Sequence, residues 1–163
     1  MMSRPVVRTR PVDDGLFVEG DDGPSLVASS CRSCGTTTFP RQQSCPKCTR
    51  MDMADRLLPR SGTLWSFTVQ SFRPKPPYAG PEPFTPYGVG YVELPGVVIV
   101  EAVLTENDPQ RLHIGAPMEL VLVPLCHDDD GTQVLTYAFS PVRSGDRERR
   151  SDENQVPNVG NHK

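Results

Sequence analysis

The amino-acid sequence predicts a mostly β protein in which a four-cysteine metal-binding ribbon precedes a five-stranded barrel of the OB type. The first observation is the spacing C-x2-C-x10-C-x2-C, formed by Cys31, Cys34, Cys45 and Cys48. The second is a series of short segments after Gly62 that are apolar, often alternating, and rich in β-branched and aromatic residues. The third is the turn chemistry between them, clearest at Pro95–Gly96 and in the acidic stretch 127–131.

Length and composition limit the architecture. A chain of 163 residues can bury one moderate core, or one core and a metal-stapled appendage. No stretch approaches the roughly 18 apolar residues that a membrane-spanning helix needs, so no membrane role is expected. Residues 1–14 lack the apolar stretch of a secretory signal, which predicts a cytoplasmic location. In that compartment thiols stay reduced, and the odd count of five cysteines also favours metal binding over a disulfide scaffold.

The composition along the chain predicts four parts. Residues 1–24 are expected to form an irregular arm, because VDDG and EGDDGP are typical of turns. Residues 25–60 are expected to form the zinc ribbon and its linker, and their first segment, SLVASS, fits either a strand or the end of a helix. Residues 61–142 are assigned to the barrel. Residues 143–163 are polar and charged, with little to bury, and are expected to form a disordered tail.

Five segments are expected to be barrel strands. GTLWSFTVQSF alternates from Gly62 onward, and a proline-rich stretch ends it. YGVGYVEL and VVIVEAVL flank Pro95–Gly96 and predict a hairpin, while MELVLVPL and TQVLTYAFSPV flank the acidic turn HDDDG. A short polar connector separates the third strand from the fourth. This count and spacing fit a partly open Greek-key barrel of the OB type, although a five-stranded sandwich is compatible with the same pattern.

The two cysteine pairs predict a structural metal site with zinc as its occupant. Two residues between cysteines permit a tight turn that aims both sulfurs at one ion, and Gly35 follows the first pair, where a left-handed conformation costs least. Four thiolates give a closed tetrahedral site with no open position for Lewis-acid catalysis. The alternatives are iron in a rubredoxin-like site, two disulfides, or free thiols. Basic residues around the knuckles favour zinc over an electron-transfer iron centre.

Several segments resemble, in the same order, one family of proteins. They are CRSCGTTTFPRQQSCPKC, GTLWSFTVQ, PYGVGYVELPGVVIVEAVL, IGAPMELVL and TYAFSPV, and they lie between Ser25 and Val142. That family joins a rubredoxin-like zinc ribbon to an OB-fold domain, was long filed as a domain of unknown function, and is associated with acyl-CoA enzymes. Its members resemble subunits of thiolases, of the archaeal thiolase and hydroxymethylglutaryl-CoA synthase assembly, and of thiolase-fold aldolases in bacterial steroid side-chain breakdown.

The resemblance implies a partner role. It implies a chain that is no enzyme on its own but binds a thiolase-fold or lipid-transfer-protein-like subunit and helps to form its CoA channel, with a CoA thioester at the partner interface. The segment KPPYAGPEPFTPYG is most similar to the steroid-associated members. One departure stands out. Family members often carry a helical pair before the ribbon, whereas residues 1–24 here are expected to be irregular, which weakens the carry-over of contacts made by such helices.

Charge is distributed unevenly along the chain. Residues 31–75 contain eight basic and two acidic side chains, and residues 76–142 contain one basic and nine acidic side chains. CoA carries a pyrophosphate and a 3′-phosphate, which suit arginine forks. The candidates for CoA-phosphate contact are Arg32, Arg41, Lys47 and Arg73. Solubilising surface charge is the alternative interpretation of each.

The proline-rich segment is a candidate partner interface. Six prolines between Arg73 and Tyr87 stiffen an arm that carries Tyr78, Phe84 and Tyr87. An extended arm with aromatic anchors suits a groove on another protein, because little conformational entropy is lost on binding. The alternative is a loop folded back over the mouth of its own barrel.

The remaining polar residues form no catalytic group that the sequence can identify. His113 lies in a polar connector and is expected to be a surface or packing histidine. Cys126 and His127 are neighbours on a predicted strand and would point to opposite faces, which is poor geometry for a nucleophile and its base. Asp128–Asp130 could hold a cation, but DDDG is above all hairpin-turn chemistry.

Two functions from different classes fit these observations. The first is the non-catalytic accessory subunit that the resemblance implies. The alternative is a single-stranded nucleic-acid-binding module, because zinc ribbons and OB barrels both serve that purpose. The acidic balance of residues 76–142 disfavours the alternative, since a groove for single strands should be electropositive.

Overall fold

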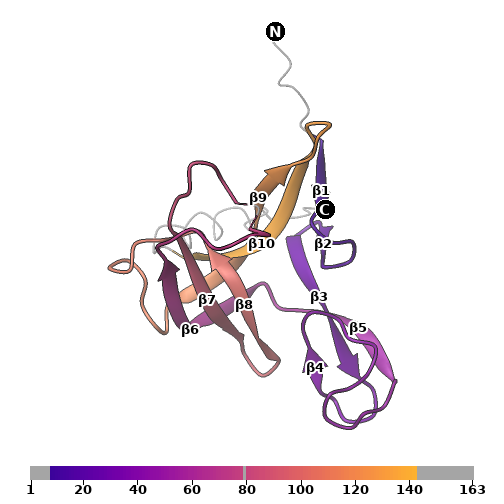
Figure 1. Ribbon diagram of the computed structural model, residues 1–163. Coiled ribbons are helices and arrows are strands. Elements are labelled where there is room, and N and C mark those ends of the chain that lie inside the picture. The colour runs from indigo at the N-terminus through magenta and orange to yellow at the C-terminus, as the bar shows by residue number, and fades with distance from the viewer. Residues whose placement is uncertain (1–7, 79, 143–163) are drawn as a thin grey trace, which may run out of the picture.

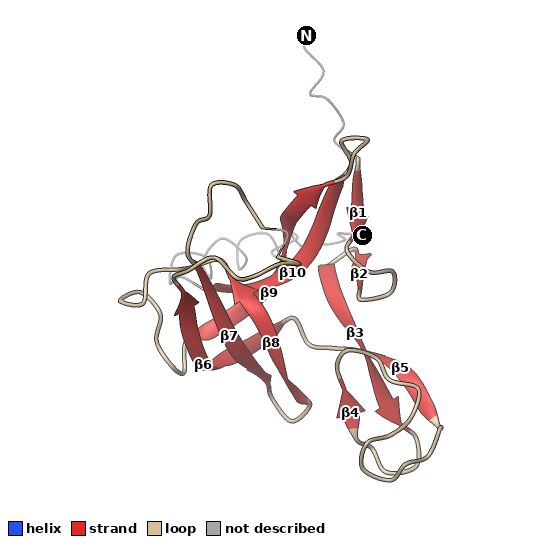
Figure 2. Ribbon diagram, in the orientation of Figure 1, coloured by secondary structure: helices blue, strands red, loops and turns tan. Residues whose placement is uncertain are grey.

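A computed structural model describes residues 8–78 and 80–142. Within these ranges the chain forms ten strands and no helix (Figure 2). In chain order they are β1 Thr9–Pro11, β2 Phe17–Gly20, β3 Gly23–Cys31, β4 Thr37–Thr38, β5 Met53–Leu57, β6 Ser61–Gln70, β7 Tyr87–Leu94, β8 Val98–Leu104, β9 Pro117–His127 and β10 Gln133–Pro141. The tail expected over residues 143–163 lies outside the described residues. No helix in the described part is both long and apolar enough to cross a bilayer.

Strands β6 to β10 close into the predicted barrel. Their order is β6-β7-β8-β10-β9, and pairing of β9 with β6 closes the ring. Every pair in the ring is antiparallel except β8 with β10, which are parallel at Ala138–Val103 and Phe139–Leu104. This order and this one parallel pair are those of an OB barrel, so the closed ring excludes the sandwich that the sequence pattern left open.

The ribbon is a small separate sheet. β3 pairs with β2, β4 and β5, all antiparallel, and Figure 1 shows β3 running from beside the barrel into the β4–β5 end of the molecule. The segment SLVASS, which the sequence left as strand or helix, is therefore strand. Its residues Leu26 to Ser29 are all buried, because β3 is the central strand of this sheet. A continuously buried run carries no alternation, which is why periodicity could not assign it.

The prediction of an irregular arm over residues 1–24 was wrong for part of residues 8–24, and residues 1–7 lie outside the described residues. The turn expected at EGDDGP is present, but the segments that flank it pair with one another as β2 and the start of β3. β1 adds to the barrel beside β10, in parallel, at Thr9–Gln133 to Pro11–Leu135. Strands of three and four residues are too short to show a period, so only their partners reveal them.

One apolar core joins the two parts. Inside the barrel it contains Leu64, Val92, Leu94, Val100, Leu104, Met118, Leu120 and Phe139. Phe17 and Leu26 from the ribbon sheet, and Leu58 from the linker, belong to the same cluster. Arg60, two residues after Leu58, ion-pairs with Glu119 of β9 at 3.6 Å. The ribbon and the barrel are therefore held together by side-chain packing and an ion pair, in addition to the linker between β5 and β6.

Candidate metal centre

The four predicted cysteines come together at the end of the ribbon. Their Sγ atoms all lie within 4.8 Å of one another, and Cys31–Cys48 and Cys34–Cys45 are each 3.6 Å apart. A tetrahedral ion with Zn–S bonds of about 2.3 Å requires sulfurs about 3.8 Å apart. A disulfide requires about 2.05 Å, and none of the four is disulfide-bonded. The donor set therefore fits one four-coordinate ion.

The two cysteine pairs sit in matching turns. The Cys31 carbonyl accepts the backbone N–H of Gly35 at 2.8 Å, and the Cys45 carbonyl accepts that of Thr49 at 2.9 Å. Each turn is then closed by the first cysteine, which donates its N–H to the carbonyl five residues later, at 2.9 Å in the first turn and 2.8 Å in the second. The sequence identified Gly35 as the left-handed position of the first knuckle. It gave no such signal for Thr49, a β-branched residue with a φ of 61°.

The sheet holds these turns in place. Cys31 is the last residue of β3, and the second knuckle ends shortly before β5, whose first residue Met53 pairs with Cys31. Cys31 and Cys45 are buried, whereas Cys34 is exposed. The ligand set thus closes the open end of an antiparallel pair, where a small sheet would otherwise fray.

Hydrogen bonds around the sulfurs favour thiolates at two positions. The hydroxyl and the backbone N–H of Thr36 lower the pKa of Cys34 to about 6. The backbone N–H of Cys48, followed by that of Lys47, lowers the pKa of Cys45. At Cys48 a backbone hydrogen bond from Arg50 acts in the same direction, but burial and the neighbouring thiols raise its pKa to about 11. Donors aimed at sulfur are what a metal-ligating thiolate needs.

The four candidate phosphate-binding residues do not form one free basic group. Arg32 pairs with Asp52 at 3.5 Å and Arg41 with Asp55 at 3.1 Å, both within the ribbon. Arg73 pairs with Glu82, so both ends of that ion pair belong to the proline-rich arm. Lys47 is exposed. Contact of these residues with CoA stays a prediction.

The aromatic residues of the arm pack on one another. Tyr78 and Tyr87 are stacked with ring centroids 6.3 Å apart, and Phe84 meets both edge-on at 6.1 and 6.3 Å. All three are half-buried. Between this cluster and β8, β9 and β10 lies a groove of about 480 Å³, lined in part by Val103, Val123, Leu125 and Thr136. The arm therefore lies against its own barrel, and its contact with a partner stays a prediction.

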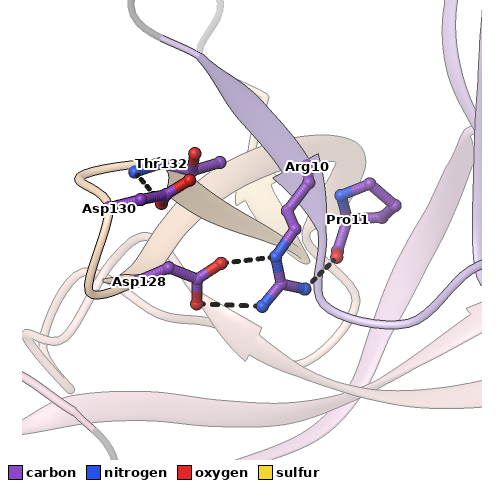
Figure 3. Close-up of polar contacts among 5 residues, drawn as sticks. All are labelled: Arg10, Pro11, Asp128, Asp130 and Thr132. Carbon is purple, nitrogen blue, oxygen red and sulfur yellow. Dashed lines mark hydrogen bonds and ion pairs between the residues drawn. The ribbon is translucent and has the colours of Figure 1, made fainter.

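The acidic turn between β9 and β10 is held by a residue that sequence reasoning missed. Arg10 of β1 donates Nε and Nη2 hydrogen bonds to the two carboxylate oxygens of Asp128, at 2.6 and 2.9 Å (Figure 3). Asp130 accepts the backbone N–H of Thr132 at 3.0 Å, and Gly131 has a φ of 82°. The hydrogen bond from Arg10 lowers the pKa of Asp128. These carboxylates are used as turn chemistry, as the sequence favoured.

The other two candidates are also placed. Cys126 is half-buried opposite Val134 of β10, while His127 next to it is exposed. His113 lies in the loop before β9 and lines a hollow of about 440 Å³ together with Glu106, Arg111 and Ile114.

Comparison with known proteins identifies both parts of the chain. Residues 19–52 match the family model described as the rubredoxin-like zinc ribbon domain of ChsH2, and residues 55–123 match the C-terminal OB-fold domain of ChsH2. The benzoylsuccinyl-CoA thiolase subunit BbsA of Thauera aromatica is 30% identical over 119 residues, which are 73% of this chain and 78% of BbsA. A DUF35 domain-containing scaffold protein of Methanocaldococcus jannaschii is 28% identical over 73% of this chain and 83% of its own length.

A solved structure shares the fold. It is described as the Ltp2-ChsH2(DUF35) aldolase, and it matches with a TM-score of 0.56 and 26% identity. The match covers 72% of this chain and 84% of that one. The similarity therefore includes both the ribbon and the barrel.

Proposed function

Because the chain belongs to the ChsH2 family, whose members join a rubredoxin-like zinc ribbon to an OB-fold domain, we propose that it is a non-catalytic accessory subunit of a thiolase-fold acyl-CoA enzyme. The observation that carries this proposal is the match to proteins named as a thiolase subunit, a scaffold protein and an aldolase component, each over about three quarters of this chain. A scaffold role needs a rigid body with exposed contact surfaces. A ribbon packed onto a closed barrel supplies one.

The metal centre supports a structural role. We assign zinc to Cys31, Cys34, Cys45 and Cys48, because four sulfurs at these separations complete its tetrahedron. Zinc would supply four bonds that hold the two knuckles together, and hydrogen-bond donors of the chain favour the thiolate form of Cys34 and Cys45. With every position filled by protein, substrate has no place on the ion.

The finer assignment names the partner. We propose a thiolase, or a lipid-transfer-protein-like aldolase of steroid side-chain degradation, as the catalytic subunit. This chain would help to shape its CoA channel in the cytoplasm. The candidate contacts to CoA phosphates remain Arg32, Arg41, Lys47 and Arg73, and three of these would exchange a carboxylate partner for a phosphate.

Co-expression tests the proposal. This chain is produced together with each thiolase-fold enzyme subunit of its source organism, and the complexes are isolated by a tag on this chain. One such subunit should co-purify in fixed ratio, and its thiolase or aldolase activity should fall or vanish when this chain is left out. Co-purification with none of them would overturn the proposal. Tight, salt-sensitive binding of a labelled single-stranded oligonucleotide would point instead to the nucleic-acid alternative.

A further inference from the structure

The outer face of β6, β7 and β8 carries exposed apolar side chains that the proposed function has not used. The strand register sets them in three cross-strand rows. The rows are Thr63–Glu93–Ile99, then Trp65/Ser66–Tyr91–Glu101, then Thr68–Val89–Val103. We call this surface the Trp65 face. Its large apolar members are among the most exposed in the barrel, with Trp65 56%, Tyr91 43%, Ile99 41% and Val103 38% accessible.

A β-bulge turns Trp65 outward. The pairing of β6 with β7 shifts register between Leu64 and Ser66, so Trp65 is the extra residue on its strand. Its ring meets that of Tyr91 edge-on, with centroids 6.3 Å apart. Bulges of this kind re-aim a side chain at the cost of regular pairing. The regular pairing of β6 with β7 is therefore interrupted at Trp65, and its indole lies on the surface instead of in the core.

The charge on this face has one sign. Glu93 of β7 stands in the first row and Glu101 of β8 in the second, and the three rows contain no lysine or arginine. Glu101 also accepts a hydrogen bond from the Tyr91 hydroxyl at 2.9 Å, which fixes both side chains. Beside them lies a hollow of about 310 Å³, lined by Tyr87, Val89, Glu101, Val103, Thr136 and Tyr137. A cationic side chain fits such a hollow, and a phosphate would be repelled from it.

We infer that the Trp65 face is the docking surface for the catalytic subunit, and that the subunit meets it with an aliphatic patch bearing at least one arginine. Trp and Tyr at the centre of a patch, next to a hollow, are the residues that carry most binding energy in protein interfaces. An arginine on the partner would extend its stem over Tyr91 and pair with Glu101, because guanidinium both stacks on aromatic rings and binds carboxylates. The same carboxylates exclude a nucleic-acid strand, although this is the face that many OB barrels use for one. The inference rests on the proposed function, since it names the contact surface of that partner.

Matched substitutions test the surface. Trp65→Ala and Ile99→Ala are each compared with a control of similar type on an exposed loop, Phe72→Ala and Ile114→Ala, whose side chains are 72% and 71% accessible. The affinity of the co-expressed catalytic subunit is measured by calorimetry for each variant. Trp65→Ala should weaken it by about tenfold or more, and the two controls by less than about twofold. Glu93→Lys should also weaken it, and the affinity of the wild-type chain should fall as salt is added.

A spectroscopic readout separates contact from misfolding. Trp65 is the only tryptophan of the chain, so fluorine-labelled tryptophan gives this subunit a single fluorine NMR resonance. That resonance should shift when the unlabelled catalytic subunit is added, and should not shift with a single-stranded oligonucleotide or with a second copy of this chain. If the wild-type chain binds the subunit but the resonance stays unchanged and Trp65→Ala binds normally, the inference is overturned and the proposed function stands. If no subunit binds the wild-type chain, both fail.

Discussion

Phe39 of the ribbon meets Tyr137 of the barrel edge-on, with ring centroids 5.5 Å apart and planes at 85°. The Tyr137 hydroxyl continues the link, since it donates a hydrogen bond to the Glu101 carbonyl on β8 at 3.0 Å. Together these two contacts connect the loop between the two cysteine pairs to strands β10 and β8 of the barrel. The orientation of the metal centre relative to the barrel therefore depends on side-chain packing as well as on the β5–β6 linker.

Removing the Phe39 ring should loosen that orientation. Phe39→Ala deletes a half-buried aromatic side chain that packs against the core, so the free energy of unfolding should fall by about 1–3 kcal/mol. Urea unfolding followed by circular dichroism measures it. Phe72→Ala, at a highly exposed phenylalanine, should change stability by less than about 0.5 kcal/mol. Equal losses in the two variants would show that the Phe39 contact adds nothing.

The purified protein should contain one zinc ion, and binding of that ion should require the buried ligand Cys45. Cys45→Ser removes a buried sulfur that faces Cys34, and we expect zinc content to fall to near zero and the ribbon to unfold. Mass spectrometry of the metal and hydrogen exchange over β3 to β5 measure both. Cys126→Ser, on β9, is the matched control and should keep its zinc. A red protein with iron in place of zinc would contradict the assignment.

The strain at Thr49 predicts a stabilising substitution. A β-branched residue in the left-handed region costs about 1–2 kcal/mol, which glycine avoids. Glycine loses more backbone entropy on folding, so Thr49→Gly should raise stability by a net amount of roughly 0.5–1 kcal/mol. Gly35→Thr, the equivalent exchange in the other knuckle, should lower it. Thermal unfolding of the zinc-bound variants measures both, and a loss of stability in Thr49→Gly would mean that its hydroxyl contact to the Cys48 carbonyl outweighs the strain.

The Arg10–Asp128 pair predicts a weak acid sensitivity. Hydrogen bonding to Arg10 depresses the folded-state pKa of Asp128, so its contribution is complete above the unfolded-state value of about 3.9 and is lost as pH falls through the folded value. The stability difference between wild type and Asp128→Asn should therefore be constant near neutral pH and shrink in acid. Denaturant midpoints across that range measure it. A difference that grows in acid would contradict this account.

The parts of the fold that rest on local chemistry could be predicted from the sequence. A C-x-x-C turn positions its own sulfurs, so the spacing of Cys31, Cys34, Cys45 and Cys48 was enough to bring them together. The alternation and the β-branched and aromatic content after Gly62 identified the segments that form β6 to β10, although they did not settle which side of β6 is buried. Turn residues at Pro95–Gly96 and Asp128–Gly131 located both hairpins.

The parts of the fold that depend on partners distant in sequence could not be predicted from the sequence. β1 is strand only because β10 is beside it, and Arg10 has a role only because Asp128 lies across that pair. The left-handed Thr49 was hidden because its residue type argues against the conformation that the knuckle imposes. The bulge at Trp65 could not be predicted either, because the sequence alternates without a break across it and such a pattern is typical of a regular strand.

The pairing of β1 with β10 also bears on how the chain is made. Residues 9–11 emerge from the ribosome long before their partner strand at residues 133–135. The ribbon, whose contacts lie within residues 17–57, can form much earlier. Contacts of such long sequence separation are closed late because of their entropic cost. The edge of β10 is thus sealed by a strand that is translated much earlier, and until the two strands pair each needs protection from other chains.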